Sequence, residues 1–273
     1  MLFSLSGNLH MVSVKDSLVD QVKVLLEQPS IDNVQDSLRL LSLERAKVLQ
    51  AEFIAKYGLK VQAGLFAGME YLPDCAEGCY IPKLLGCYEA ELEPYFRQAI
   101  AKPYQAIVNV GCSEGFYAVG LAKLMPQVQV YAHDTNEAAW ADCQQLASQN
   151  GVGNQIHIGG TFSPADFQNF ADRQTLVLCD IEGGEEGLLD PNLAPALSQM
   201  DIIVELHDGF APNIQETLIQ RFKQSHEISI VPHALRGITL PPLLQTWGSL
   251  DQLLALCEWR AFPTPWLVMW AKS

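Results

Sequence analysis

Apolar residues recur three and four positions apart over residues 14–57, which is the period of an amphipathic helix. The pattern forms two runs, and Pro29 interrupts it between them. Gly58 follows the second run and is a typical residue to end a helix. We therefore expect two consecutive helices, then an irregular Gly-, Pro- and Cys-rich stretch over residues 58–87, and a further helix over residues 89–101.

From residue 105 the pattern changes to short apolar runs that alternate with amphipathic helices. The predicted strands cover residues 106–110, 128–132, 155–158, 175–179, 201–206, 227–231 and 266–270. Strands that alternate with helices form a mainly parallel sheet that is covered on both faces. The fold class expected is α/β, a doubly wound, mainly parallel, seven-stranded Rossmann-like sheet with an N-terminal helical extension. We place the extension at residues 1–90 and the sheet domain at residues 91–273.

Composition narrows the classes of partner. The 273 residues are 49% hydrophobic, but no apolar run approaches the roughly 20 residues needed to cross a bilayer, so no membrane segment is expected. The formal net charge of −14 would repel a polyanion over most of the surface, so we expect no nucleic-acid partner. The partner expected is a small-molecule acceptor, and the oligomeric state leaves no signal in the sequence.

The cysteines indicate a reducing, cytoplasmic setting, because the seven of them are an odd number and are mostly isolated. Cys75, Cys79 and Cys87 lie close together, but no fourth zinc ligand stands at the usual spacing. We therefore predict buried thiols there and no zinc site.

The strongest local signal is the Gly-rich turn after the first strand. Gly111, Gly115 and Gly120 give the spacing Gly-x-x-x-Gly-x-x-x-x-Gly. Glycines permit positive φ and close approach of a ligand, and ligands of open α/β sheets bind at the carboxyl ends of the strands. This spacing is not the dinucleotide fingerprint, and no P-loop lysine follows. The turn therefore favours an uncharged nucleoside over a diphosphate; the alternative is a tight turn without a ligand.

Asp134 ends the second strand. A carboxylate at that position can accept hydrogen bonds from both ribose hydroxyls of a nucleoside. The alternative is that Asp134 caps the helix that begins near Thr135, and the two roles can coexist.

Strands four and five bring ionisable residues to one edge of the predicted sheet. These residues are Asp180, Glu182, Glu205, His207 and Asp208. Ionisable groups gathered beside apolar strands perturb one another's pKa values, which is common at functional sites. His207 is the natural general base, since its ordinary pKa lies near neutrality. The alternatives are a divalent-cation site and a set of solvated loop acids and helix caps.

Three motifs carry a family resemblance. Residues 109–115 resemble the first, SAM-binding motif of class I S-adenosylmethionine (SAM)-dependent methyltransferases. Residues 180–185 resemble the D-[IV]-E-G-[AG]-E run of the FkbM-like group, and residues 205–207 its E-x-H element. Residues 64–69 and 83–92 look like segments of an uncharacterised bacterial branch. The chain is thus most similar to FkbM-like methyltransferases.

The resemblance implies SAM as the cofactor. The residues expected to bind it are Asn109, Gly111, Cys112, Glu114, Gly115, Asp134 and Asp180. Adenine would lie beside residues 158–161, which lack the usual acid of the family. Asn109 replaces the acid of the first motif, and its carbonyl can accept from an ammonium group without charge assistance. Glu114 or Glu89 would then supply the negative charge.

The function expected is SAM-dependent methylation of an oxygen nucleophile, a small-molecule or sugar-type hydroxyl. His207 is the expected base, with Asp180, Glu182 and Glu205 as orienting groups or metal ligands. A divalent metal is compatible with this cluster but is not predicted. The alternative function is a catalytically silent nucleoside- or SAM-binding interaction module, while the glycine spacing disfavours an NAD(P)-dependent oxidoreductase.

Overall fold

A computed structural model describes residues 11–28, 30–73, 79–234 and 238–272. The chain divides into two compact units. One comprises Met1–Gly58 and Leu240–Cys257, and the other Leu59–Thr239 and Glu258–Ser273. The predicted boundary at residue 90 is a statement about which segments can fold alone. A division into compact units does not test that, so the boundary stays a prediction.

The smaller unit is helical. Its helices are α1 (Met11–Glu27), α2 (Ile31–Tyr57), α9 (Pro242–Gln245) and α10 (Ser249–Ala255). The side chain of Ser30 caps α2 by accepting from the backbone N–H of Asn33, and Gly58 ends that helix with φ 73°. Arg45 of α2 donates two hydrogen bonds to Asp251 of α10, at 2.9 and 2.6 Å. The two helical runs read from the sequence are thus confirmed.

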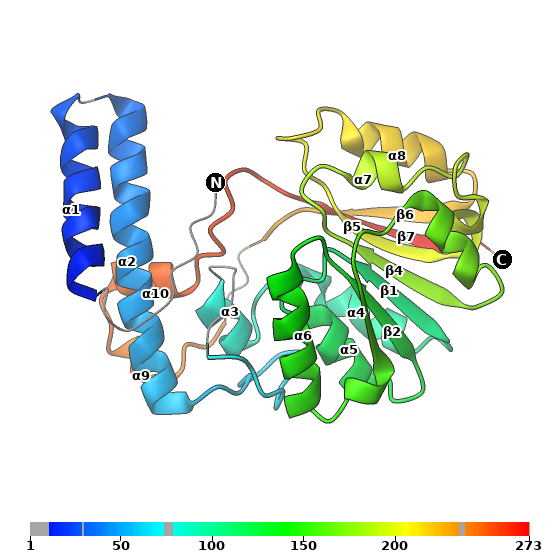
Figure 1. The fold of residues 1–273 in the computed structure, drawn as a ribbon, viewed down its shortest axis with the longest axis horizontal. Coiled ribbons are helices and arrows are strands. Elements are labelled where there is room, and N and C mark those ends of the chain that lie inside the picture. Colours follow the sequence, from blue (N-terminus) through cyan, green and yellow to red (C-terminus); the bar gives the residue numbers. More distant parts are fainter. Residues whose placement is uncertain (1–10, 29, 74–78, 235–237, 273) are drawn as a thin grey trace. The chain divides into compact units, whose positions relative to one another are not determined.

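The larger unit contains one seven-stranded sheet (Figure 1). Its strands are β1 (Ala106–Val110), β2 (Gln129–His133), β3 (Ile156–Gly159), β4 (Thr175–Cys179), β5 (Asp201–Glu205), β6 (His226–Val231) and β7 (Trp266–Ala271). Their order is β3-β2-β1-β4-β5-β7-β6, and β7 runs antiparallel to the other six strands. The predicted fold class, a doubly wound and mainly parallel α/β sheet with N-terminal helices, is confirmed.

Helices cover both faces of this sheet (Figure 1). One face carries α4 (Glu93–Ile100), α5 (Phe116–Leu124) and α6 (Glu137–Gln149). The other carries α7 (Glu185–Leu188), α8 (Ile214–Phe222) and the 3-10 helices η3 (Pro164–Phe170) and η4 (Pro195–Gln199). The remaining short elements are α3 (Tyr80–Leu85), η1 (Ala90–Leu92) and η2 (Gly153–Gln155).

Three segments differ from the sequence-based expectation. The stretch expected to be irregular contains α3, which ends at Gly86 in the left-handed region with φ 76°. The helix expected over residues 89–101 is divided into η1 and α4. The sequence predicts a short helix over residues 164–171, after the third strand; the structure has the 3-10 helix η3 there, begun by a reciprocal capping box of Ser163 and Asp166.

The central strands β1, β4 and β5 are buried at every position. Because both faces are covered, their sequences are continuous apolar runs rather than alternating ones. Four buried residues of these strands are polar: Asn109 and Glu205 lie at or next to the carboxyl ends of β1 and β5, whereas Thr175 and Asp201 begin β4 and β5. Among the described helices, none is both long and apolar enough to cross a bilayer.

Candidate functional site

The carboxyl ends of four neighbouring strands lie level with one another. Val110 of β1 is paired with His133 of β2 and with Cys179 of β4, and Cys179 is paired with Val204 of β5. The next residue along each strand therefore lies at the same edge. Those residues are Gly111, Asp134, Asp180 and Glu205, all of which the sequence singled out.

The glycines of the turn fit the protein's own packing. Gly111, with φ 79°, donates its backbone N–H to the carbonyl of His133 at 2.8 Å. A Cβ there would lie 1.6 Å from the carbonyl oxygen of Asp180, and one on Gly115 would lie 2.6 Å from Sγ of Cys143. The neighbouring strand and α6 thus require both glycines, so the physical reason for them differs from the close ligand approach first inferred. Their contact with SAM stays a prediction.

Asp134 joins the tip of β2 to the Gly-rich turn. One carboxylate oxygen accepts from the backbone N–H of Ser113 at 2.9 Å, and the other from that of Asn136 at 2.8 Å. The N-cap of α6 is Asn136, whose side chain accepts from Ala138, so the capping role considered for Asp134 belongs to Asn136. A carboxylate has about four acceptor positions, which leaves about two for ribose hydroxyls.

Asn109 presents an unsatisfied acceptor. Its side chain is buried near the end of β1, and Oδ1 has no hydrogen-bond partner among the described residues. A buried acceptor without a donor costs about 1–3 kcal/mol. An ammonium group is a donor that would remove this cost, as the resemblance implies for the amino-acid part of SAM.

Glu114 is committed to an internal ion pair. Lys83 and Glu114 are 2% and 1% exposed, and the Lys83 Nζ lies 2.5 Å from Glu114 Oε1. The hydroxyls of Tyr71 and Ser113 also donate to this carboxylate. Burial opposes ionisation, but the Lys83 charge and these hydrogen bonds hold the pKa of Glu114 below its ordinary value. Its negative charge is therefore balanced within the protein, and its predicted contact with SAM has no support from this geometry.

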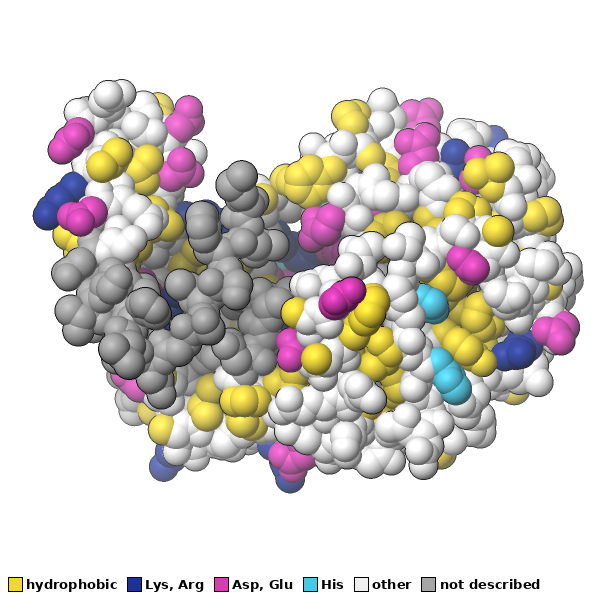
Figure 2. All heavy atoms as spheres, viewed as in Figure 1, with side chains coloured by type: hydrophobic (Ala, Val, Ile, Leu, Met, Phe, Trp, Pro, Cys, Tyr) yellow, Lys and Arg dark blue, Asp and Glu magenta, His cyan; other side chains and the backbone are white. Residues whose placement is uncertain are grey.

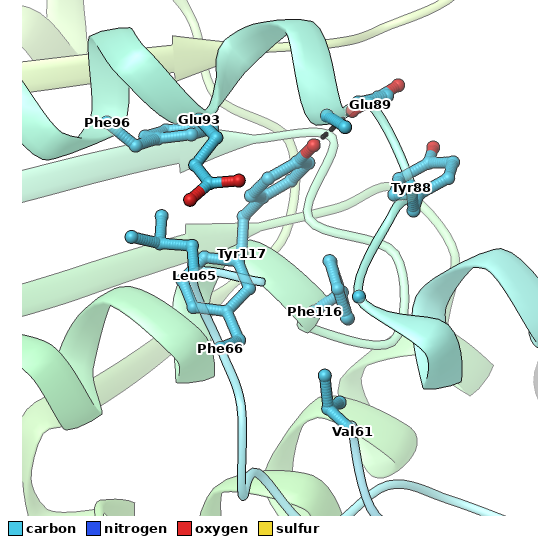
Figure 3. A pocket seen from close by; sticks show the side chains of 11 residues that line it. Val61, Leu65, Phe66, Tyr88, Glu89, Glu93, Phe96, Phe116 and Tyr117 are labelled. Carbon is cyan, nitrogen blue, oxygen red and sulfur yellow. Dashed lines mark hydrogen bonds between the residues drawn. The ribbon is translucent and has the colours of Figure 1, made fainter. Parts of the chain in front are cut away.

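Glu89, the other acid considered for that charge, is also paired. It accepts from Arg260 at 2.6 Å and from the hydroxyl of Tyr117. Burial and the nearby Glu205 carboxylate raise the pKa of Glu89 to about 8, although Arg260 opposes this. It lines a pocket of about 350 Å³, including space open to solvent, beside the start of α5 (Figure 3).

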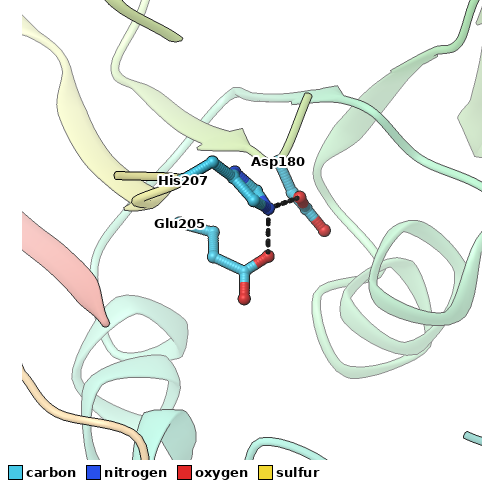
Figure 4. A group of neighbouring side chains, drawn as sticks. All are labelled: Asp180, Glu205 and His207. Carbon is cyan, nitrogen blue, oxygen red and sulfur yellow. Dashed lines mark ion pairs between the residues drawn. The ribbon is translucent and has the colours of Figure 1, made fainter. Parts of the chain in front are cut away.

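Four carboxylates surround His207, and Figure 4 shows two of them, Asp180 and Glu205. Nδ1 lies 2.8 Å from Oε1 of Glu185. Nε2 lies 3.4, 3.5 and 3.6 Å from carboxylate oxygens of Glu205, Glu182 and Asp180. The structure therefore gathers four of the five residues predicted here. For the fifth, Asp208, no ion pair with this cluster is found among the described residues, and its Oδ1 is buried without a hydrogen-bond partner.

The carboxylates make His207 a cation at neutral pH. Burial lowers the pKa of the imidazole, but hydrogen bonds to Glu185 and Glu205 outweigh it and raise the pKa to about 10. The general-base role inferred from an ordinary imidazole pKa therefore requires that this proton is lost first. Glu205 is held ionised: burial raises its pKa, but His207 and Arg260 lower it to about 2.

Two residues of this cluster were missed by sequence reasoning. Glu185 is fully buried at the start of α7, and the sequence indicates it only as the last residue of the motif at residues 180–185. Arg260 donates to Glu205, to Glu89 and, at 3.2 Å, to Glu258. Arg260 lies 55 residues from Glu205 along the chain, so no local spacing indicates it.

The cluster is compatible in shape with a divalent cation. One ligand atom each from Asp180, Glu205 and His207 lies within 4.8 Å of the other two. The imidazolium already places a positive charge there at neutral pH, so we assign no metal to the cluster. The cysteine group considered for zinc includes Cys75, which lies outside the described residues. The buried thiol of Cys79 donates to the backbone carbonyl of Glu258 at 2.8 Å, and Cys87 is half-buried.

Aromatic side chains border His207. Phe210 is 59% exposed, and its ring centroid lies 6.2 Å from that of His207 at an interplanar angle of 29°. Phe262 meets Phe210 edge to face at 5.1 Å. An exposed aromatic surface thus adjoins the imidazole.

No family model and no curated protein sequence matches the chain. The O-methyltransferase from Bacillus cereus in complex with SAH is 10% identical, with a TM-score of 0.42 over 95% of this chain and 97% of that one. The ribosomal protein L11 methylase from Lactobacillus delbrueckii subsp. bulgaricus is 18% identical, with a TM-score of 0.45 over 69% and 80%. The SAM-dependent O-methyltransferase from Thermotoga maritima is 9% identical, with a TM-score of 0.44 over 66% and 64%. At these values the similarities assign neither a family nor an activity to the chain.

Proposed function

We propose that the chain is a SAM-dependent methyltransferase that acts on a hydroxyl group of a small-molecule or sugar-type acceptor. One observation carries the proposal. The edge of the sheet that holds the Gly-rich turn and Asp134 also holds His207 and its carboxylates, at the ends of β4 and β5. The residues proposed to bind a nucleoside and the residue proposed to accept a proton thus lie at the same carboxyl edge, where open α/β sheets bind ligands.

The residues on the SAM side fit that cofactor in part. Asn109 offers a buried acceptor without a donor, and Asp134 retains acceptor positions for a ribose. Glu114, whose charge Lys83 balances, is not used in this assignment. SAM would supply an electrophilic methyl group on a sulfonium, and its sulfur would leave as a neutral thioether.

The chain's own residues align the acceptor and receive its proton. Alignment of reacting groups supplies roughly 7–11 kcal/mol, and a general base contributes about 10²–10⁴-fold. Nε2 of neutral His207 takes the hydroxyl proton as the oxygen bonds to the methyl carbon. Asp180 and Glu205 then stabilise the imidazolium. The exposed ring of Phe210 suits the apolar face of a sugar or another ring.

Membership of the FkbM-like group stays a prediction that rests on the motifs alone. So does the cytoplasmic location, which rests on the cysteines. The alternative is a catalytically silent SAM-binding module. It would bind SAM as the proposed enzyme does but would not transfer the methyl group.

Transfer of a labelled methyl group from SAM to a panel of sugars and small alcohols tests the proposal. We expect labelled product from the wild type and a rate about 10²–10⁴-fold lower from His207→Ala, with SAM affinity nearly unchanged. A chelator arm is included, since loss of activity on chelation would make the cluster a metal site. Binding of SAM without transfer to any acceptor would favour the silent module.

A further inference from the structure

We infer that Glu185 is a positioning residue, which fixes the imidazole of His207 so that Nε2 faces the acceptor. The inference rests on the proposed function for what Nε2 does there. The part of the inference that concerns how the imidazole ring is held rests on geometry alone.

Glu185 is a buried carboxylate with several hydrogen-bond partners, unlike an acid on the surface. Its side chain is fully buried, and Oε1 lies 2.8 Å from His207 Nδ1. The same oxygen accepts from the backbone N–H groups of Ile181 and Gly183, each at 3.2 Å. Three donors therefore converge on one carboxylate oxygen, which fixes its position relative to both the loop after β4 and the segment after β5.

The loop between β4 and α7 is shaped to make these contacts. Glu182 and Gly183 both have positive φ, 55° and 102°, and this turns the N–H of Gly183 back toward Glu185. A non-glycine residue in the left-handed region is strained, and such strain is common where a site demands it. A Cβ on Gly183 would lie 2.9 Å from Cβ of Phe210, so the loop also packs against the segment that follows β5.

The consequence for His207 is a fixed tautomer. Nδ1 keeps its proton in the hydrogen bond to Glu185, so Nε2 is the nitrogen that gains and loses a proton. This is the relationship between the buried carboxylate and the histidine of a Ser-His-Asp triad. The charged groups that face the ring are Asp180 after β4, Glu182 in the loop, Glu185 of α7 and Glu205 of β5, with Arg260 behind Glu205.

The test is an NMR titration of the His207 ring nitrogens, in the wild type and in Glu185→Gln. In the wild type above the pKa, Nδ1 should retain the proton and Nε2 should lose it. In Glu185→Gln the pKa of His207 should fall by about 1–3, because one opposite charge is removed. Glu186→Gln is the matched control: this neighbour is half-buried, lies near Arg221 and has no ion pair with His207 among the described contacts, so the titration should not change.

Kinetics provide the second readout. Glu185→Gln should lower kcat at least about tenfold, and up to the about 10⁴-fold seen when the carboxylate behind a catalytic histidine is neutralised, with the KM for SAM unchanged. A wild-type ring that is protonated at Nε2 in its neutral form would overturn the inference, as would an unchanged His207 titration in Glu185→Gln. If the titrations agree but no acceptor is methylated, the inference about the ring stands and the proposed function fails. The wild-type titration decides the matter even if the variant does not fold.

Discussion

Among the single residues of the site, Asp134 gives the most specific prediction about ligand binding. Its carboxylate already accepts two backbone N–H groups, and the ribose would use the positions that remain. Asp134→Ala should therefore weaken SAM binding by about 1–3 kcal/mol, because the hydroxyls lose a charged acceptor. Isothermal titration calorimetry with SAM measures this directly.

Asp190→Ala is the matched control for that variant. Asp190 accepts from the backbone N–H of Asn192 at 2.9 Å, the same local contact that Asp134 makes with Asn136, but it pairs with Arg221 away from the turn. The control should bind SAM with unchanged affinity. Equal affinities for both variants and the wild type would reduce Asp134 to a residue that holds the turn.

His207 predicts the direction of the pH dependence. Its folded pKa is raised to about 10, so the neutral form that can accept a proton increases about tenfold per pH unit from neutrality upward. A bound sulfonium is a nearby like charge and would lower this pKa. The kcat/KM for an acceptor should therefore rise with pH and level off at or below about pH 10. A rate that is flat over this interval, or falls with pH, would remove His207 as the base.

The sequence located the residues of the cluster but not their partners. Two predicted apolar strands lead to Asp180, Glu205 and His207. Because parallel strands bring their carboxyl ends to one edge of the sheet, these residues could be expected to lie together. The charge state of His207 depends on Glu185, 22 residues away, and on Arg260 behind Glu205. Such contacts arise from tertiary packing, and an ordinary pKa therefore gave the wrong protonation state at neutral pH.

At the scale of elements, burial on both faces made the strands easy to predict. The bounds of β1 and β4 agree with the apolar runs, and β2 is displaced by one residue toward Asp134. The helices α7 and α9 span four residues each and were missed, since one turn is too short to show a period. The seven residues of η3 were predicted to be helical, but they are too few for the apolar pattern to distinguish a 3-10 period from an α-helical one.

The contact between α3 and the Gly-rich turn yields a stability prediction. Lys83 of α3 forms an ion pair with Glu114 of the turn, and both side chains are almost completely buried. Replacement of one partner leaves the other charge buried without compensation, which costs about 3–5 kcal/mol. Lys83→Met should therefore lower the free energy of unfolding by that amount in a denaturant titration.

Two further variants make the measurement specific. Lys60→Met removes an ion pair with Glu70 whose side chains are about half exposed, and it should cost at most about 1 kcal/mol. The double variant Lys83→Met/Glu114→Gln should recover much of the lost stability, because no unpaired charge remains. A loss for Lys83→Met no larger than that for Lys60→Met would show that the buried pair does not hold α3 to the turn.

For the whole molecule, charge and topology limit the ligand classes. The net charge is −14, and on the face seen in Figure 2 the lysine and arginine side chains are scattered rather than gathered into a patch. The dinucleotide-binding sheet has the strand order 3-2-1-4-5-6. Here the antiparallel β7 lies between β5 and β6, and the turn lacks the dinucleotide glycine spacing. Both differences weigh against a nicotinamide cofactor.

Thermal unfolding of the intact chain tests this choice of ligand without any acceptor. A ligand that binds only the folded state stabilises it by about 2.7 kcal/mol at a hundredfold excess over its Kd. SAM and its demethylated product should therefore raise the melting temperature, and NAD and NADP should leave it unchanged. Asp134→Ala should show a smaller rise with SAM than the wild type at the same concentration, whereas Asp190→Ala should show the full rise. A rise in melting temperature with NAD and none with SAM would overturn the assignment of the Gly-rich turn, because the folded chain would then bind a dinucleotide and not SAM.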